Sequence, residues 1–264
     1  MRYYVDDAFA CGPFTGNPAG VCVVEEPLTD EQMQSIAAEN RLSETAFVSK
    51  NGNMWDIRWF TPVREVGICG HATLGTAYVI MNYVEPGLER IVFNSRENGI
   101  LTAEREGDVY YLDFPLRQLE EMPVEPLVEK ALGVPVKQYY HNPLDPDVIY
   151  AMLYSQREVD DLEPDIRQIA AIPDIVGVVA MAKGDDCDYV SRFFAPKMGI
   201  DEDPVTGAIE MCMIPLWKEL LGKDTFVARQ LSKRRGLKFL KHKGDRVSIG
   251  GRVEMFIKGE IVNI

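Results

Sequence analysis

Short runs of apolar residues, each closed by turn-forming residues, recur along most of the chain. Runs of this length between Gly, Asn, Asp and Pro are typical of strands. They predict strands at 3–9, 20–24, 90–94, 100–105, 109–114, 246–249 and 252–257. Two stretches differ, ATLGTAYVIM after His71 and GAIEMCMIPLW from Gly207, because nearly every residue in them is small or apolar. Helices without a polar face are buried, so we expect both stretches to be central helices with strands around them.

An internal repeat organises these elements. Residues 58–62 (RWFTP) recur as residues 192–196 (RFFAP), and the same ungapped shift pairs Cys69 with Asp203. Each copy predicts a strand, a turn, a second strand that ends at the proline, a polar loop and a helix. The predicted elements are 45–50, 54–61 and a helix at 70–83 in the first copy, and 177–182, 188–194 and a helix at 204–221 in the second.

The repeat predicts two half-domains of one design. We expect an N-terminal lobe at 1–117 and a C-terminal lobe at 118–264, with closing strands that can cross over between them. The strand-rich pattern predicts an α+β fold in which most neighbouring strands are antiparallel. The segment after Thr29 has the spacing of a capping box and one apolar side, which predicts an outer amphipathic helix.

Composition narrows the class of protein. The 264 residues are 46% hydrophobic and 26% charged, as in ordinary globular proteins. The formal net charge of −13, without a basic stripe among aromatic residues, disfavours nucleic acid as a partner. The densest basic run, SKRRGLKFLKHKGDR after Leu231, is interpreted as a solvated face.

The expected compartment follows from three further features. The first residues, MRYYVDDAF, contain no apolar signal segment, and no apolar stretch is long enough to span a membrane. The five cysteines form no CxxC pair, which indicates free thiols in a reducing compartment. We therefore expect a cytoplasmic protein without a membrane partner.

Candidate chemistry concentrates at two loop-to-helix junctions, GICGHATLG and GIDEDPVTGAIE. Helix N-termini bind anions through free N–H groups, although close packing of central helices explains the small residues equally well. The ungapped repeat would place the Cys69 thiol and the Asp203 carboxylate near one pocket. Glu44, in RLSETAFV at the entry to an apolar strand, either caps backbone donors or belongs to a site. The sequence has no glycine-rich nucleotide motif and no HExxH, and its three histidines are scattered, so neither a cofactor nor a metal is expected.

Several motifs together resemble one family. The motifs that carry the resemblance are LSETAFV, RWFTPVREVGICGHATLG, TGNPAGVCVV, YLDFP, RFFAPKMGIDEDPVTG and QLSKRRG. With them, the chain resembles the phenazine-biosynthesis PhzF-like family, which shares the diaminopimelate epimerase fold. The resemblance runs from the first strand to the closing strands. It implies two β-rich lobes, each wrapped round a central helix, with an active site between them and a homodimer.

The family's functional residues can be carried over position by position. The resemblance implies that Glu44, His71 and Asp203 are catalytic. This sequence departs from the family pattern at Ala208 and Glu210, where members of the family usually have serine and histidine. The substrate of this protein therefore need not be the substrate of those relatives. The predicted substrate-binding residues are Asn17, Cys69, Gly70, Ala72, Thr73, Val205, Thr206, Gly207, Ala208 and Glu210.

The expected activity is a cofactor-independent isomerisation of a small carboxylic acid. Glu44 would move a proton within the substrate, with a pKa lifted by partial burial. His71 and Asp203 would orient and polarise the substrate, and the helix N-termini would hold its carboxylate. Two alternatives stay open. One is an amino-acid racemase or epimerase with two thiols, which the repeat disfavours because it supplies only Cys69. The other is a non-catalytic protein that binds a small ligand or serves as a scaffold.

Overall fold

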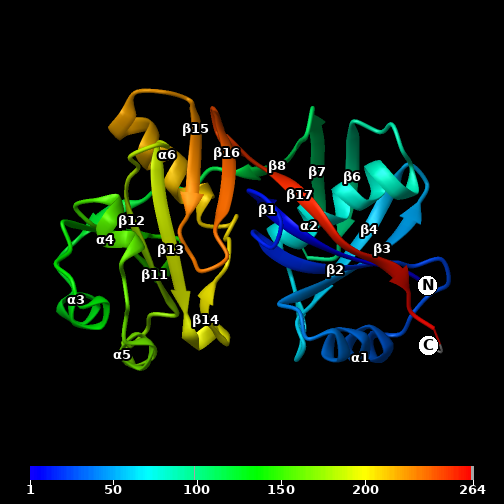
Figure 1. Ribbon diagram of the computed structural model, residues 1–264, viewed down its shortest axis with the longest axis horizontal. Coiled ribbons are helices and arrows are strands. Elements are labelled where there is room, and N and C mark those ends of the chain that lie inside the picture. Colours follow the sequence, from blue (N-terminus) through cyan, green and yellow to red (C-terminus); the bar gives the residue numbers. More distant parts are fainter. Residues whose placement is uncertain (98, 263–264) are drawn as a thin grey trace. The chain divides into compact units, whose positions relative to one another are not determined.

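The computed structural model describes residues 1–97 and 99–262, and it divides into two compact units (Figure 1). Unit 1 comprises Met1–Phe114 and Ser248–Ile264, and unit 2 comprises Pro115–Val247. This division differs from the predicted lobes in two respects. The first boundary lies slightly earlier in the chain, and the C-terminal residues from Ser248 belong to the first unit.

Unit 1 consists of strands around a central helix. Its strands are β1 (Arg2–Ala10), β2 (Asn17–Val23), β3 (Glu44–Asn51), β4 (Met54–Phe60), β5 (Glu65–Val66), β6 (Arg90–Ser95), β7 (Gly99–Glu106) and β8 (Val109–Pro115), with most of β17 (Arg246–Glu260). Its helices are α1 (Asp30–Asn40), α2 (Gly70–Val79) and the π-helical turn η1 (Ile80–Val84). Most pairs are antiparallel, as predicted, whereas β2–β3 and β4–β6 are parallel.

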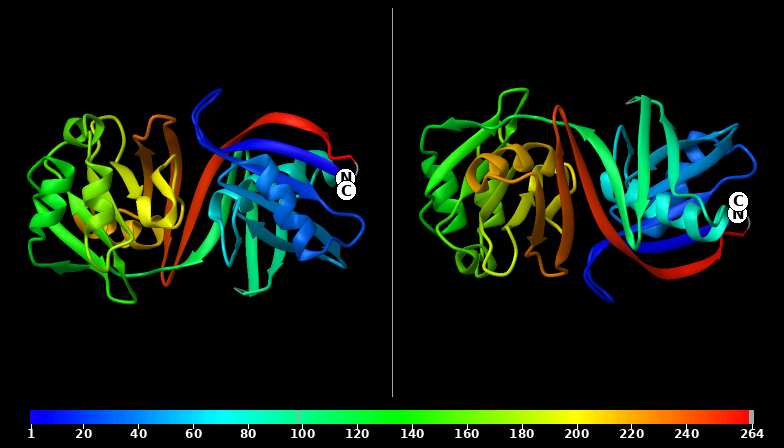
Figure 2. Two further views of the ribbon diagram at one scale, coloured as in Figure 1. Left: turned by 90° about the horizontal axis from the view of Figure 1, so that it is seen from below. Right: turned by 90° about the horizontal axis from the view of Figure 1, so that it is seen from above.

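The two long helices of unit 1 have different surroundings. Helix α2 packs against β1, β2 and β3, and eight of its ten residues are buried, as its unbroken apolar sequence predicts. Helix α1 lies on the outside of the strands, as Figure 2 shows. Its capping box between Thr29 and Gln32 is present, and Met33 and Ala37 bury against a small apolar cluster. The predicted helix at 70–83 is therefore confirmed, with its last turn in the wider π form.

Unit 2 repeats this plan with additional outer helices. Its strands are β9 (Glu120–Met122), β10 (Gln138–Asn142), β11 (Asp145–Met152), β12 (Gly177–Lys183), β13 (Tyr189–Ala195), β14 (Ile200–Asp203), β15 (Thr225–Gln230) and β16 (Gly236–Lys243). Its helices are α3 (Pro126–Leu132), α4 (Gln156–Asp160), α5 (Ile166–Ala171), α6 (Glu210–Leu221) and the 3₁₀ turn η2 (Pro196–Met198). A large apolar core lies between β10–β13 and helices α3, α4 and α5.

Helix α6 is the central helix of unit 2, and it begins later than predicted. The sequence predicts a helix over 204–221, but regular α-helix starts only at Glu210. The preceding backbone is held in another conformation, because the Asp203 and Pro204 carbonyl oxygens accept hydrogen bonds from Gln230 Nε2 at 2.9 Å and Ser232 Oγ at 2.6 Å. Pro215 lies inside the helix.

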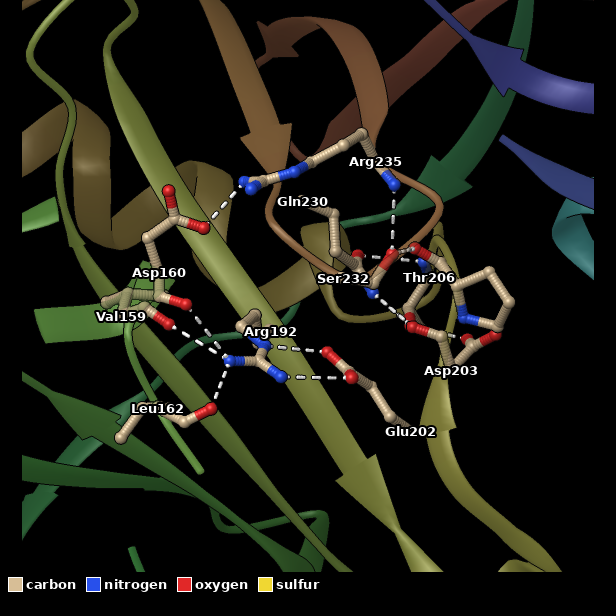
Figure 3. Close-up of polar contacts among 11 residues, drawn as sticks. Val159, Asp160, Leu162, Arg192, Glu202, Asp203, Thr206, Gln230, Ser232 and Arg235 are labelled. Carbon is tan, nitrogen blue, oxygen red and sulfur yellow. Dashed lines mark hydrogen bonds and ion pairs between the residues drawn. The ribbon is translucent and has the colours of Figure 1, made fainter. Parts of the chain in front are cut away.

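The register of β14 corrects the ungapped match between the two copies. In unit 1, β4 pairs Trp59 with Val66, and in unit 2, β13 pairs the equivalent Phe193 with Asp203, not with Ile200. Two bidentate ion pairs show the same offset, because Arg58 binds Glu65, seven residues on, and Arg192 binds Glu202, ten residues on (Figure 3). By this register Asp203 is the counterpart of Val66, so the predicted ungapped match of Cys69 with Asp203 is wrong. The second copy has three extra residues before Asp203.

Among the helices of residues 1–97 and 99–262, none is both long and apolar enough to cross a membrane.

Candidate functional site

The junction before α2 gathers four of the predicted site residues. Parallel pairing of β2 with β3 puts Ala19 opposite Glu44, which brings the first residues of both strands together beside α2. His71, in the first turn of α2, lies at the centre. Its Nε2 is 3.2 Å from Glu44 Oε2, and its Nδ1 is 3.3 Å from Asn17 Nδ2 and 3.5 Å from Cys69 Sγ. The imidazole is buried, with 8% of the residue exposed.

Other predicted residues of this junction shape the helix start. Cys69 is the N-cap residue of α2, and the Thr73 hydroxyl donates to the Cys69 carbonyl at 2.6 Å, so that hydroxyl closes the first turn. Ala72 is fully buried and Gly70 is half-buried. Ser43, which the sequence did not single out, places its Oγ 3.3 Å from His71 Nε2.

The contacts of this site favour an ion pair between Glu44 and His71. Burial opposes ionisation of Glu44, but hydrogen bonding and charge from His71, with help from Ser43 and Cys69, hold its pKa below the ordinary value. The sequence-based expectation that burial would raise this pKa is wrong, because the imidazole outweighs desolvation. Burial likewise opposes the imidazolium, but contacts with Cys69 and Glu44 raise the pKa of His71 well above its usual range.

Cys69 is the second acid in contact with the imidazole. Burial raises the pKa of the Cys69 thiol, and the neighbouring His71 only partly offsets this. Cys69 and Glu44 both contribute to the raised pKa of His71, and the contact with Cys69 is the larger of the two causes. Donor atoms of Glu44, Cys69 and His71 lie within 4.8 Å of one another, a separation that suits a metal ion. As a metal ligand, the imidazole of His71 would have to be neutral.

A further buried carboxyl lies beneath this site. Asp6, on β1, is fully buried, and neither of its oxygens has a hydrogen-bond partner among the described residues. It occupies the space that a side chain on Gly75 would need. Because Gly75 follows His71 by four positions, Asp6 and the imidazole lie along the same face of α2. Burial, and secondarily the charge of Asp7, raise the pKa of Asp6 well above its usual value, although His71 opposes this.

The junction before α6 contains Asp203 and Thr206 in direct contact. The Thr206 hydroxyl donates to Asp203 Oδ2 at 2.5 Å. Gln230 hydrogen-bonds to both residues, and the close-up in Figure 3 shows its amide beside them. Val205 and Gly207 are buried, Ala208 is exposed, and the side chain of Val205 occupies the space beside Gly236.

Glu210 is held inside unit 2 by two partners. Its carboxylate forms an ion pair with Lys238 Nζ and accepts a hydrogen bond from Tyr189 Oη, and all three side chains are completely buried. Burial and the charge of Glu210 raise the pKa of Tyr189 well above its usual value, so the phenol remains a donor. The resemblance implied that Glu210 binds the substrate. Its carboxylate instead neutralises a buried ammonium.

Lys238 also corrects the interpretation of the basic run after Leu231. That run was interpreted as a solvated face, yet Lys238 has no exposed surface. Along β16 the buried positions alternate, and Lys238 shares the inward face with Gly236 and Leu240. In the sequence, apolar Leu237 and Phe239 flank Lys238, so the hydrophobic alternation of this strand predicts an outward Lys238 and could not have identified its burial. No sequence signal marks Asp6 either, whose neighbour Asp7 is also buried.

A surface groove of about 430 Å³ lies elsewhere in unit 1. Met33, Phe47 and Arg58 are among its lining residues, and it includes none of the predicted site residues. The predicted site residues therefore lie at the two junctions and not in this groove.

The arrangement of two strand-wrapped central helices is found in known structures. A crystal structure of a phenazine biosynthesis protein of the PhzF family from Enterococcus faecalis matches with a TM-score of 0.95 and 42% identity, over 100% of both chains. A hydroxyproline epimerase from Agrobacterium vitis matches with a TM-score of 0.61 and 11% identity, covering 98% of this chain and 91% of that one. The second likeness shows the fold alone, which is the diaminopimelate epimerase-like fold predicted from the sequence.

Sequence comparison gives the family within that fold. Residues 6–259 match the family model described as phenazine biosynthesis-like protein. An uncharacterized isomerase from Pseudomonas aeruginosa is 43% identical over 99% of this chain and 98% of its own length. The chain belongs to the phenazine biosynthesis-like (PhzC–PhzF) family.

Proposed function

We propose that this protein is a cofactor-independent isomerase that moves a proton within a small carboxylic acid. The observation that carries the proposal is the buried contact of 3.2 Å between Glu44 Oε2 and His71 Nε2. A general base must be ionised before it accepts a proton, and His71 holds the pKa of Glu44 below its ordinary value. Family membership and the isomerase name of the Pseudomonas aeruginosa relative support this type of reaction.

The proposed reaction balances without another reactant. Glu44 takes a proton from a carbon that the substrate's own conjugated system activates, and the electron pair of the broken C–H bond moves into that system. Protonated Glu44 then returns the proton to a different carbon. The imidazolium of His71 stabilises the negative charge that develops on the substrate while Glu44 is neutral.

Asp203 and the residues around it are proposed to bind the substrate. The loop from Val205 to Ala208 supplies small residues, and the carboxylate of Asp203 supplies a fixed acceptor for a donor group. A homodimer, implied by the family resemblance, stays a prediction that light scattering of the purified protein can test.

The racemase alternative is weakened by the sequence of the junction before α6. An enzyme with two thiols needs a second cysteine at this junction, and residues 203–209 contain none. The neutral Cys69 thiol beside a charged imidazole also acts as a packing and hydrogen-bonding group. We therefore propose Glu44, and not Cys69, as the group that exchanges protons with the substrate.

Deuterium exchange tests the proposal. Cyclic and amino-substituted carboxylic acids are incubated with the protein in D₂O, and deuterium incorporation is followed by NMR and mass spectrometry. With an acid that exchanges, Glu44→Gln should slow incorporation by at least about a hundredfold, and Cys69→Ser should change it by less than about tenfold. Unaltered exchange in Glu44→Gln would remove Glu44 from its role. A thousandfold loss in Cys69→Ser would favour the thiol mechanism, and binding without exchange would favour the non-catalytic alternative.

A further inference from the structure

Gln230, the last residue of β15, uses its whole side-chain amide to contact the loop that carries Asp203. Its Nε2 donates to the Asp203 carbonyl at 2.9 Å and to Thr206 Oγ1 at 3.2 Å. Its Oε1 accepts from the Thr206 backbone N–H at 2.9 Å and from Lys238 Nζ at 3.2 Å. The side chain is completely buried, so water does not compete for these bonds.

The partners of Gln230 permit only one orientation of its amide. An ammonium and a backbone N–H donate and never accept, so Lys238 and Thr206 N require the oxygen on their side. The Asp203 carbonyl only accepts, so it requires the NH₂ group on the other side. A rotated amide would set donors against donors beside a buried positive charge. The charge of Lys238 is itself balanced by Glu210.

The fixed amide determines the direction of the next hydrogen bond. Thr206 Oγ1 accepts from Gln230 Nε2, so its own hydrogen is directed to Asp203 Oδ2. The hydrogen bonds therefore run one way, from the ammonium of Lys238 through Gln230 and Thr206 to the carboxylate of Asp203. The carboxylate at the end is held at one oxygen and cannot rotate without breaking the series.

We propose that Gln230 is a positioning residue for Asp203 and Thr206, oriented by the buried Lys238–Glu210 ion pair. The proposal rests on the substrate-binding role proposed for this loop. It assigns to Glu210, one of the two departures from the family pattern, the task of balancing Lys238. It also explains why α6 begins only at Glu210, since the carbonyl of Asp203 and the amide of Thr206 bond to Gln230 and not within a helix.

Hydrogen exchange of the ligand-free protein tests this role. Gln230→Met keeps the volume and removes all four bonds. Val128→Ala, on α3 and in the apolar core of unit 2, is the matched control because it lowers stability at a position outside this loop. We expect the Thr206 amide to exchange at least tenfold faster in Gln230→Met than in the control at equal global stability. The carboxyl ¹³C signal of Asp203, assigned with Asp203→Asn, should move only in the Gln230 variant.

A second variant separates the two sides of the amide. The double variant Gln230→Glu with Glu210→Gln exchanges the amide and the carboxylate between the two positions. Lys238 still faces one carboxylate and one amide, so we expect this variant to fold. It retains an acceptor for the Thr206 amide but loses both Nε2 donors, so that amide should stay protected while the Asp203 signal moves. This variant also decides the question if Gln230→Met fails to fold.

The proposal is overturned if the Asp203 signal is unmoved in the folded variants, or if the Thr206 amide exchanges in Gln230→Met within threefold of Val128→Ala. Either result would mean that Gln230 merely fills space. Because these measurements use no substrate, they are independent of the deuterium screen. A failed screen with a positive exchange result would reject the isomerase and keep the positioning role.

Discussion

Each unit buries one carboxyl completely beside its central helix, and the two units stabilise that carboxyl differently. In unit 1, Asp6 reaches from a strand to the face of α2 at Gly75 and has no hydrogen-bond partner among the described residues. In unit 2, Glu210 belongs to the helix itself and meets Lys238 and Tyr189. A buried carboxyl is tolerated either by keeping its proton or by pairing its charge. Burial raises the pKa of Asp6, which favours the first solution, and the ion pair of Glu210 with Lys238 is the second.

The difference has a consequence for the two junctions. In unit 1, a protonated Asp6 leaves the charges of Glu44 and His71 balanced against each other, so the cluster can gain or lose a proton. In unit 2, Lys238 and Glu210 fix the charges behind the loop, and the hydrogen bonds lead in one direction to Asp203. The first junction thus holds ionisable groups in contact with one another, and the second holds a carboxylate in one orientation.

Breaking the ion pair should give the largest effect. Lys238→Met leaves Glu210 buried without its counter-charge, and we expect a loss of about 3–5 kcal/mol in the free energy of unfolding. The double variant Lys238→Met with Glu210→Gln has no unpaired buried carboxylate at position 210, so it should regain most of the lost stability. Urea unfolding of the full chain measures both values.

The exposed pair between Lys218 and Asp224 is the matched control. Lys218→Met should cost less than about 1 kcal/mol, because solvent screens a surface ion pair. A Lys238→Met variant as stable as the Lys218→Met variant would show that Glu210 does not depend on its buried partner.

Removing the lone carboxyl should have the opposite sign and depend on pH. Burial raises the pKa of Asp6 well above its ordinary value of 3.8, so the folded state holds a proton that the unfolded chain releases. The stabilisation is complete below the unfolded pKa and is lost as pH rises toward the folded pKa. Asp6→Asn cannot titrate and escapes this loss. The stability of Asp6→Asn relative to the native protein should therefore increase as pH rises above the unfolded pKa, with a slope of at most about 1.4 kcal/mol per pH unit.

Unfolding curves of both proteins across this pH range give the measurement. Asp7→Asn, at the neighbouring buried position, controls for the general effect of removing an acid from β1. Parallel stability profiles for Asp6→Asn and the native protein would show that Asp6 is ionised in the folded state.

The close approach of Asp6 to α2 gives a third test. Replacing a helical glycine by alanine usually adds up to about 1 kcal/mol of stability. At Gly75 the new methyl group would overlap Asp6 Oδ1, so Gly75→Ala should instead cost about 1–3 kcal/mol. In an Asp6→Ala background the same change should become stabilising. Gly70→Ala, with no atom near the added methyl, should stay within about 0.5 kcal/mol.

Most of the fold could be predicted because its signals are local. Strands β3 and β4 and their repeats β12 and β13 appear where apolar runs end at turn residues. Both central helices were predicted from stretches without a polar face. The three extra residues of the second copy could not be found by extending the ungapped match. They lie in a polar loop, where no hydrophobic pattern defines the register. Only the spacing between each repeated arginine and its glutamate reveals it.

The candidate site was predictable only in part. Family resemblance directed attention to the two junctions, and the structure brings Glu44 and His71 into contact. The residues behind them were missed, since Lys238 and Asp6 are charged types that are normally exposed. Their burial depends on partners or space supplied by segments distant in the chain, Glu210 for Lys238 and Gly75 for Asp6. The sequence of the strand that carries each residue therefore does not predict these contacts.

The smallest expected effect separates the two departures from the family pattern. Ala208 is exposed, so Ala208→Ser should change the free energy of unfolding by less than about 0.5 kcal/mol. Glu210→His, by contrast, removes the only carboxylate paired with Lys238 in the described structure and sets a second base against a buried ammonium. It should cost several kcal/mol, on the order of a broken buried pair. Thermal unfolding of the two single variants and their combination decides the matter. Additive losses dominated by position 210 would establish that this departure serves the interior of unit 2 and leave position 208 as the one open to substrate selection. Equal, small effects at both positions would mean that Glu210 can be exchanged as freely as a surface residue, and the contrast between the paired and the unpaired carboxyl would not hold.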